Sequence, residues 1–405
     1  MSLTMHIYSK KDDTSQGWDV SEIVHDIEYT TSILGQPGKL TFVLEKDMYD
    51  SGLQISVGSL VKFWHSDDDS KEENPVFMGN VFTIGTDRSE AYRIVAYDSL
   101  RYLQNHQDMV IPERENELEY FFNEIVGFEF EEAERKIINW NNYIKGVKIR
   151  GNVFTDESSF NILQFCMDDY ATNSQLKITA KNFNMISNNE IKQTYFKPKF
   201  YIRDNFGTIE LREIFTDFIY NDDGTEKDEF LIIGNESLLT NYQYEVDIDK
   251  NTFNEFYLMY NKKDKQTDPD TNKQVKEKSM IMALQAGTVI EKTNTKLDGQ
   301  TIGDDTIPKW GKLRKIVTLN DSTIDGNAEN YIKEMVQLFN QPTRSMKLSA
   351  LGYDGLYAGG SFIFKLDKLK INYPVYVLSA THHYGGDSHT MELEVNVNPK
   401  MEMFV

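Results

Sequence analysis

Residues 57–98 read VGSLVKFWHSDDDSKEENPVFMGNVFTIGTDRSEAYRIVAYD. A Gly-Ser step precedes a first apolar run, Leu60–His65, and Pro75 starts a second run that extends to about residue 84. A polar turn, Gly85–Glu90, leads into a third run, Ala91–Tyr97, in which apolar and polar residues alternate. Alternation with a period of two is typical of half-buried strands. We therefore predict three antiparallel strands here.

A second stretch near the C-terminus has the same plan. Residues 359–396 read GGSFIFKLDKLKINYPVYVLSATHHYGGDSHTMELEVN, and sixteen positions separate Pro75 from Ala91 as they do Pro374 from Thr390. The matching positions are Gly58, Pro75 and Ser89 in the first stretch and Gly360, Pro374 and Ser388 in the second. The pattern favours two copies of one β module, and the alternative is that two hairpins of similar length resemble each other by chance.

Length and composition indicate a folded protein of several domains. The chain has 405 residues, of which 40% are hydrophobic and 12% aromatic, enough for two to four packed cores. The one cysteine, Cys166, excludes intramolecular disulfides and lies in an apolar helical pattern, so we expect a buried thiol.

The net charge of −21 bears mainly on partners. An acidic surface repels phosphate backbones and anionic membranes, which argues against sequence-specific nucleic-acid binding, although simple solubility would also explain it. No run approaches the about 18 apolar residues of a membrane span, and the N-terminus lacks a secretory signal pattern. We expect a protein that stays soluble in a cytoplasm or is assembled there into something larger, and we expect no membrane partner.

The first domain is expected to span residues 1–108. Strands are predicted at Val20–Ile33 and Lys39–Glu45, and in the second of these Leu40, Phe42 and Leu44 share one face. With the strands of 57–98 they suffice for a small barrel or sandwich.

An α+β domain is expected at 109–236. Apolar residues spaced at i, i+3, i+4, i+7 and i+8 predict a helix with one buried stripe: Leu118, Phe121, Phe122, Ile125 and Val126. Asp156 or Ser158 can cap a second helix, Ser159–Tyr170, and strands are predicted at 143–150, 175–180, 199–203 and 207–214.

A second β domain is expected at 237–400, followed by a tail at 401–405. Leu238–Asp249 and Phe253–Asn261 are predicted to pair as a hairpin, and an exposed insertion is expected at 262–311. Asp325 begins a helix whose apolar face is formed by Ala328, Tyr331, Ile332, Met335, Val336 and Phe339. The predicted class is mainly β: two similar small antiparallel β-barrels plus an α+β insertion.

Neither metal nor catalytic motifs are complete in the sequence. Asp268–Asn272 and Asp247–Asn251 begin like calcium loops but lack the glycine and glutamate that the geometry requires. His382, His383 and His389 lie near one predicted hairpin; we expect them to be exposed, with His383 and His389 the pair that could face each other. Cys166 has no histidine in its own domain, and we predict no enzyme, no cofactor and no metal site.

The most specific motif is AYDSLRYLQNHQDMVI, residues 96–111. It resembles the XkdQ-like tail proteins of contractile prophages, which are similar to the baseplate hub proteins of contractile phage tails and phage-tail-like bacteriocins. The resemblance extends to the helix at 158–170 and to the order of helix, strand and closing hairpin after residue 325. The insertion at 262–311 departs from it.

The resemblance implies a structural baseplate hub, a virion or tail-particle component, that forms a homotrimeric ring. Two barrels in each of three chains would present six similar units to a six-fold tail tube and remain three-fold toward the spike. The implied partners are the tail tube protein, the spike protein and other baseplate proteins, and an acidic lumen would let DNA or tape-measure protein pass. Alternatives are a tube-initiator or receptor-binding tail protein, or a tail-associated cell-wall hydrolase.

Overall fold

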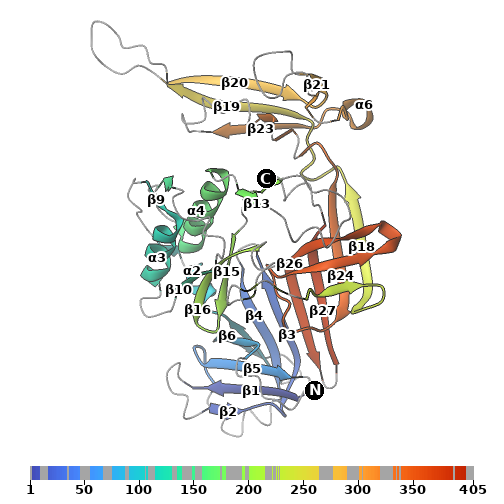
Figure 1. Cartoon of the computed structure of the whole chain (residues 1–405). Coiled ribbons are helices and arrows are strands. Elements are labelled where there is room, and N and C mark those ends of the chain that lie inside the picture. The colour runs from blue at the N-terminus through green and yellow to red at the C-terminus, as the bar shows by residue number, and fades with distance from the viewer. Residues whose placement is uncertain are drawn as a thin grey trace, which may run out of the picture. The chain divides into compact units, whose positions relative to one another are not determined.

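The computed structural model shows two compact units (Figure 1). The described residues are 2–9, 17–33, 36–45, 55–66, 75–86, 91–104, 106–107, 115–129, 135–138, 148–150, 157–173, 176–178, 194–196, 200–214, 221, 225, 227, 229–263, 277–289, 301–302, 304–319, 332–333, 335–336, 339–385 and 388–397. The first unit comprises Met1–Tyr244 and Met346–Val397, and the second is formed mainly by Glu245–Ser345.

Strands from the N-terminal part of the first unit fold around one apolar core, and together they are called the first lobe. They are β1 (Ser2–Tyr8), β2 (Gly17–Asp19), β3 (Val24–Ser32), β4 (Gln36–Leu44), β5 (Leu60–Ser66), β6 (Phe77–Thr86) and β7 (Tyr92–Tyr97). Their order is β3-β4-β7-β6-β5-β1-β2, and all neighbours are antiparallel. Leu40, Phe42 and Leu44 are all fully buried, as the alternation predicted.

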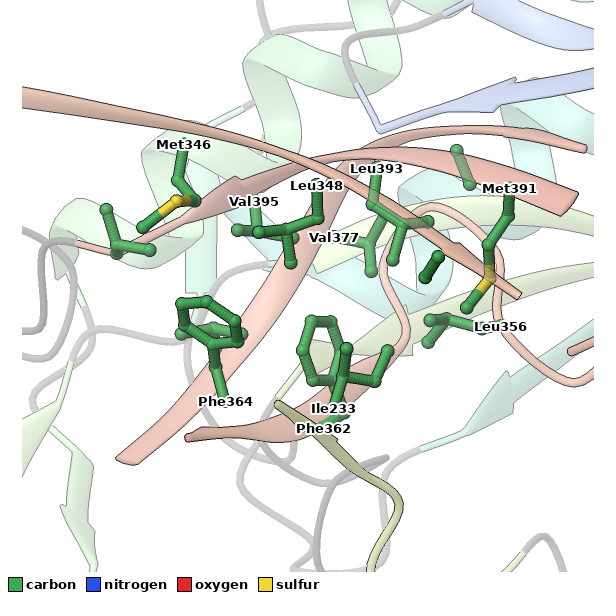
Figure 2. Packing of buried hydrophobic residues seen from close by; sticks show 14 of the residues in the cluster. Ile233, Met346, Leu348, Leu356, Phe362, Phe364, Val377, Met391, Leu393 and Val395 are labelled. Carbon is green, nitrogen blue, oxygen red and sulfur yellow. The ribbon is translucent and has the colours of Figure 1, made fainter. Parts of the chain in front are cut away.

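A second lobe follows the same principle at the C-terminal end. It contains β17 (Ile232–Gly234), β18 (Leu239–Asp247), β24 (Thr343–Leu351), β25 (Ser361–Leu366), β26 (Ile371–Gly385) and β27 (Ser388–Asn396). Figure 2 shows side chains of β24 and β27, such as Met346 and Leu393, facing Phe362 and Phe364 of β25 across the core. The two phenyl rings pack edge to face at 6.4 Å.

The two lobes share one sheet because β26 is long enough to serve both. Its first part pairs with β25, from Leu366 opposite Ile371 onward, and its last part pairs with β3, from Ser379 opposite Ser32 to Tyr384 opposite Ile27. A 13-stranded sheet therefore runs through both lobes. We call the β3–β26 contact the seam.

The expected α+β part lies beside the lobes in the first unit. Its helices are α2 (Leu100–Leu103), α3 (Leu118–Glu129) and α4 (Ser159–Asn173). Its strands are β8 (His106–Gln107), β9 (Glu115–Glu117), β10 (Arg135–Ile138), β11 (Lys148–Arg150), β12 (Glu157–Ser158), β13 (Leu176–Ile178), β14 (Thr194–Phe196), β15 (Phe200–Asn205) and β16 (Thr208–Glu213).

The helix predictions for this part are confirmed. All five stripe residues of α3 are fully buried in the core that α4, β15 and β16 complete. Cys166 is buried in the same core. Ser158 provides the first-turn contact of α4, because its Oγ accepts the Asn161 N–H at 3.2 Å.

The second unit has its own small sheet and core. Its elements are β19 (Glu255–Lys263), β20 (Glu277–Gln285), β21 (Thr288–Val289), β22 (Thr301–Ile302), α6 (Ile307–Trp310) and β23 (Arg314–Leu319). The sheet order is β20-β19-β23, with β23 parallel to β19. Ile332 and Val336 of the helix predicted at 325–340 are buried against Phe256 and Leu258, whereas Asp325, Ala328 and Tyr331 lie outside the described residues.

The predicted hairpin of 238–249 and 253–261 is wrong. β18 pairs with β24, and β19 pairs with β20 and β23. Between these strands the Asp247 carboxylate accepts the N–H groups of Asp249 and Lys250 at 3.0 and 3.1 Å, and Phe253 N–H donates to the Phe339 carbonyl. A local turn signal was present, but it does not fix the partner of the strand that follows.

The mainly β class with antiparallel sheets and an α+β insertion is confirmed, but the two expected barrels are not closed. Among the described strands, β3 and β2, the two ends of the first lobe, do not pair with each other. The reason is the seam: β3 uses its outer edge to bind β26. Within the described part of the chain, helices are too short or too polar to cross a bilayer. The tail at 401–405 and residues 264–276, 290–300 and 303 of the insertion expected at 262–311 lie outside the described residues.

Candidate functional site

Both lobes contain the same tight turn. In the first lobe, Ser59 N–H donates to the Ser56 carbonyl at 3.0 Å, and in the second lobe Gly360 N–H donates to the Tyr357 carbonyl at 2.9 Å. The third residue of each turn is a glycine with positive φ, 93° at Gly58 and 91° at Gly359. This is the conformation that type II turns reserve for glycine.

Each turn is fixed to a neighbouring strand in the same way. Gly58 N–H donates to the Val81 carbonyl, and Val81 N–H donates to Ser59, both at 2.8 Å. Gly359 and Gly360 make the corresponding two bonds with Val377 at 2.8 and 2.9 Å.

The strands that hold the turns are also irregular at the same place. The pairing of β6 with β7 shifts between Val81 and Thr83, and the pairing of β26 with β27 shifts between Val377 and Ser379. A bulge of this kind bends a strand and increases its twist. The order β3-β4-β7-β6-β5 in the first lobe matches β18-β24-β27-β26-β25 in the second.

The six positions that the sequence suggested as markers of the repeat do not all occupy matching places in the two lobes. By their hydrogen bonds, Gly58 of the first lobe corresponds to Gly359 of the second, and Ser59 corresponds to Gly360. The expected match of Gly58 with Gly360 is therefore off by one residue. Pro75 precedes β6, whereas Pro374 lies within β26, opposite Ile363. Ser388 begins β27, and Ser89 lies outside the described residues.

The two turns differ in what covers them. A Cβ atom at Gly359 would lie 2.5 Å from the Tyr201 ring, while one at Gly58 would meet nothing within 4 Å. Arg203 stacks on Tyr357 with its guanidinium carbon 3.6 Å from the ring centre. The α+β part, through β15, therefore packs on the turn of the second lobe.

The specific motif at 96–111 connects the first lobe to the α+β part. Asp98 follows β7, and its carboxylate accepts the N–H groups of Gly38 at 2.7 Å and Leu100 at 3.1 Å. Asp204 accepts the Ser99 N–H at 2.8 Å. Burial, and then the nearby Asp204, raise the pKa of Asp98 well above its usual value. The motif thus forms a buried polar joint, and its residues 108–111 lie outside the described part of the chain.

A second buried polar group lies at the seam and is called the histidine cluster: His65, Asp354, His382, Tyr384 and His389. His65 Nδ1 lies 2.6 Å from Asp354 Oδ2, and the Tyr384 hydroxyl donates to Asp354 Oδ1 at 2.8 Å. His389 Nε2 lies 3.0 Å from His382 Nδ1. His382 Nε2 lies 2.7 Å from the Leu356 carbonyl.

The expectation of exposed hairpin histidines is wrong for two of the three. His382 is 2% exposed and His389 6%, while the His383 side chain is 43% exposed. The strand register explains the error. His389 lies opposite the buried Tyr384, and His382 is two residues before Tyr384 on the same strand face, so both histidines point to the core and His383 points outward.

Burial and hydrogen bonding act against each other in this cluster. Burial alone would raise the pKa of Asp354, but the hydrogen bond from His65 and the charges of His389 and His65 hold that pKa below its usual value. Burial lowers the pKa of His382, which favours the neutral ring, and it raises the pKa of Tyr384. Among the described residues, His65, Asp354 and His389 could together hold a metal ion.

A family model described as YQBQ-like matches residues 27–284 and 291–396. The chain belongs to the YQBQ-like family. The sequence motif had suggested XkdQ-like tail proteins, and the matching family is YQBQ-like. No curated protein matches this sequence.

This YQBQ-like chain shares its fold with solved tail proteins, two of them from prophages. The prophage tail protein gp18 of Listeria monocytogenes superposes with a TM-score of 0.54 at 12% identity, covering 96% of this chain and 94% of gp18. A tail protein of Neisseria meningitidis gives 0.56 at 9% identity, covering 100% of each chain. The 43 kDa tail protein of prophage MuSo2 from Shewanella oneidensis gives 0.57 at 9% identity, covering 99% of this chain and 100% of that one.

Sequence reasoning missed His65 and Asp354 in this YQBQ-like chain. His65 alternates with Val61 and Phe63, both fully buried, so the period-two pattern of β5 carried a signal that it points inward. Asp354 lies in the segment between β24 and β25, where no pattern indicates its neighbours.

Proposed function

We propose that this chain is the structural hub of a contractile-tail baseplate, in which three copies form a ring that adapts a six-fold tail tube to a three-fold spike. The observation that carries the proposal is the duplicated turn and bulge, held by the same hydrogen bonds in two lobes of the same strand order. Three chains with two similar lobes each present six similar units. The shared fold with tail proteins from three bacteria supports the assignment.

The seam gives a template for contacts between copies. Inside the chain, the last part of β26 binds β3 of the other lobe. In the shared strand order, β6 of the first lobe corresponds to β26, and β18 of the second lobe corresponds to β3. Among the described strands, residues 83–86 of β6 pair on one side with β7, and β18 pairs on one side with β24. We propose that β18 of one copy binds this part of β6 in the next, so that a repeated seam closes the ring.

The proposed partners follow from this geometry. The six lobes would face the tail tube protein, and the α+β part would contact the spike and other baseplate proteins. The domain limits 1–108, 109–236 and 237–400 are part of the proposal, and the separate cores of the lobes and the α+β part support them. The net charge of −21 suits a lumen through which DNA or tape-measure protein passes without binding. The role needs no catalytic group.

Cysteine cross-linking tests the ring. Thr86 is the fifth residue after Val81, as His382 is after Val377. Tyr244 corresponds to Tyr29, the residue opposite His382, because each of these tyrosines packs on the core of its own lobe. Thr86→Cys with Tyr244→Cys is expected to give oxidised species up to a trimer, three times 47.0 kDa, when the chain is co-expressed with its tube and spike proteins.

Each single variant, Thr86→Cys or Tyr244→Cys, is the matched control and is expected to stay uncross-linked beyond background. Mass measurement of the reduced complex gives the number of copies independently. Particles that incorporate the double variant but yield no trimer, or a hub mass that is not threefold, would overturn the proposal.

A further inference from the structure

The histidine cluster draws ligands from both lobes into one buried place. His65 comes from β5 of the first lobe, His389 from β27, and Asp354 from the segment before β25. One nitrogen of each ring and one carboxylate oxygen all lie within 4.8 Å of one another. The side chains of His65 and His389 are 4% and 2% exposed, and that of Asp354 is 22% exposed.

Hydrogen bonding fixes which nitrogen of His389 points to Asp354. His382 Nε2 faces a carbonyl oxygen, so it must donate, and a neutral His382 then accepts at Nδ1. His389 Nε2 therefore donates to His382. The other nitrogen of His389, Nδ1, lies 3.7 Å from Asp354 Oδ1, with its lone pair on that side when the ring is neutral.

This is the arrangement of a metal-binding histidine. Ligating imidazoles almost always donate their second N–H to a protein acceptor, which fixes the ring orientation and the tautomer. Here the acceptor is Nδ1 of His382, and the His382 ring is held in turn by the hydrogen bond from its Nε2 to the Leu356 carbonyl. Asp354 is oriented in the same manner by the Tyr384 hydroxyl, whose ring also stacks on His389 at 4.4 Å.

We propose that His65 Nδ1, His389 Nδ1 and the Asp354 carboxylate bind one Zn²⁺ ion that joins the two lobes. Two imidazoles and one carboxylate suit zinc and related transition metals, whereas Ca²⁺ and Mg²⁺ prefer oxygen ligands alone. Three protein ligands leave a fourth tetrahedral position for water. His65 Nδ1 lies 2.6 Å from Asp354 Oδ2 and His389 Nδ1 lies 3.7 Å from Asp354 Oδ1, on either side of the ligand separation of about 3.3 Å expected for Zn–ligand bonds of about 2.0 Å. The three ligand atoms of the set lie within 4.8 Å of one another, so the two rings would move closer together around the ion.

The first measurement is metal binding by the untagged full chain after treatment with a chelator. Calorimetric titration with ZnCl₂ is expected to show one site per chain, and CoCl₂ is expected to give the visible absorption bands of a tetrahedral Co²⁺ ion. CaCl₂ is expected to give no binding at this site. A folded wild-type chain that binds no Zn²⁺ and gives no Co²⁺ bands overturns the proposal and leaves the cluster as a hydrogen-bonded contact only.

Variants identify the ligands. Asp354→Asn keeps the shape of the side chain and removes its charge, and it is expected to weaken Zn²⁺ binding at least 100-fold. His382→Gln, which loses the support behind His389, is expected to weaken it about 10–100-fold. His383→Gln is the matched control, because its side chain points outward on the same strand, and it is expected to bind as wild type does. Equal affinity in wild type and Asp354→Asn would place the metal elsewhere and overturn the assignment, and the wild-type Co²⁺ spectrum decides the question if a variant fails to fold.

Discussion

At the scale of single residues, the two turn glycines have the same backbone but different surroundings. Both have φ near 90°, which costs a side chain about 1–2 kcal/mol. At Gly359 a methyl group would also press against Tyr201, whereas at Gly58 it would meet open space. Gly58→Ala is therefore expected to lower the free energy of unfolding by about 1–2 kcal/mol and Gly359→Ala by more.

Urea unfolding of the two variants checks this difference, with Gly85→Ala as a control at a strand glycine that has no positive φ and no close neighbour. Equal losses for Gly58→Ala and Gly359→Ala would show that Tyr201 yields without cost.

Asp98 predicts a pH dependence. Its pKa in the folded state is raised well above the usual value, first by burial and then by Asp204, so the folded state holds this proton more tightly than the unfolded chain does. The contribution of Asp98 to stability is therefore largest below its unfolded pKa of about 3.9 and falls as the pH rises through the folded pKa. In Asp98→Asn this slope is expected to disappear, so the variant loses less stability relative to wild type at pH 8 than at pH 5.

The measurement is the free energy of unfolding of both proteins from pH 4 to 8. Asp367→Asn is the control, because that side chain lies in an exposed 3-10 turn. A difference between wild type and Asp98→Asn that is constant with pH would contradict the prediction.

At the scale of elements, the seam depends on threonine hydroxyls as well as on strand pairing. Thr31 Oγ1 accepts the Ala358 N–H at 2.9 Å, and Ala358 is buried. Thr31→Val keeps the shape and the preference for strand but removes that acceptor, so it is expected to cost about 1–3 kcal/mol. Thr30→Val, whose hydroxyl contacts only the Thr381 hydroxyl at 3.2 Å among the hydrogen bonds described for it, is expected to cost less than 1 kcal/mol.

Thermal unfolding and limited proteolysis compare these two variants. If Thr30→Val proves as damaging as Thr31→Val, the Ala358 contact is not the one that holds the lobes together.

The elements differ in how far the sequence reveals them. The strands of 57–98 and the stripe of α3 could be predicted because a period of two or 3.6 residues is a local property. The partner of β18 could not, because pairing with β24 brings together strands separated by the whole second unit. The histidine cluster is harder still: the alternation of β5 indicates that His65 points inward, but Asp354 is 289 positions away and no local pattern pairs the two.

At the scale of the whole molecule, the second unit is inserted between two strands that already neighbour each other. β18 lies beside β24. Leu351 N–H donates to the Leu238 carbonyl and the Thr240 hydroxyl donates to the Ser349 carbonyl, so the two strands run in opposite directions and Tyr244 lies near the start of β24. The compact unit Glu245–Ser345 is therefore longer than the insertion expected at 262–311, and its removal leaves a gap that a short hairpin turn can close.

Replacing residues 245–345 by a turn of two to five residues with Asn-Gly at its centre is expected to leave a folded first unit, because both lobe cores and the α+β core lie in that unit. Circular dichroism and a single cooperative thermal transition check the fold. If ring closure belongs to the lobes, the shortened chain carrying Thr86→Cys and Tyr244→Cys still forms cross-linked trimers with its tube and spike proteins. A shortened chain that folds but no longer cross-links would assign the contact between copies to the second unit, because the lobes alone would then fail to close the ring.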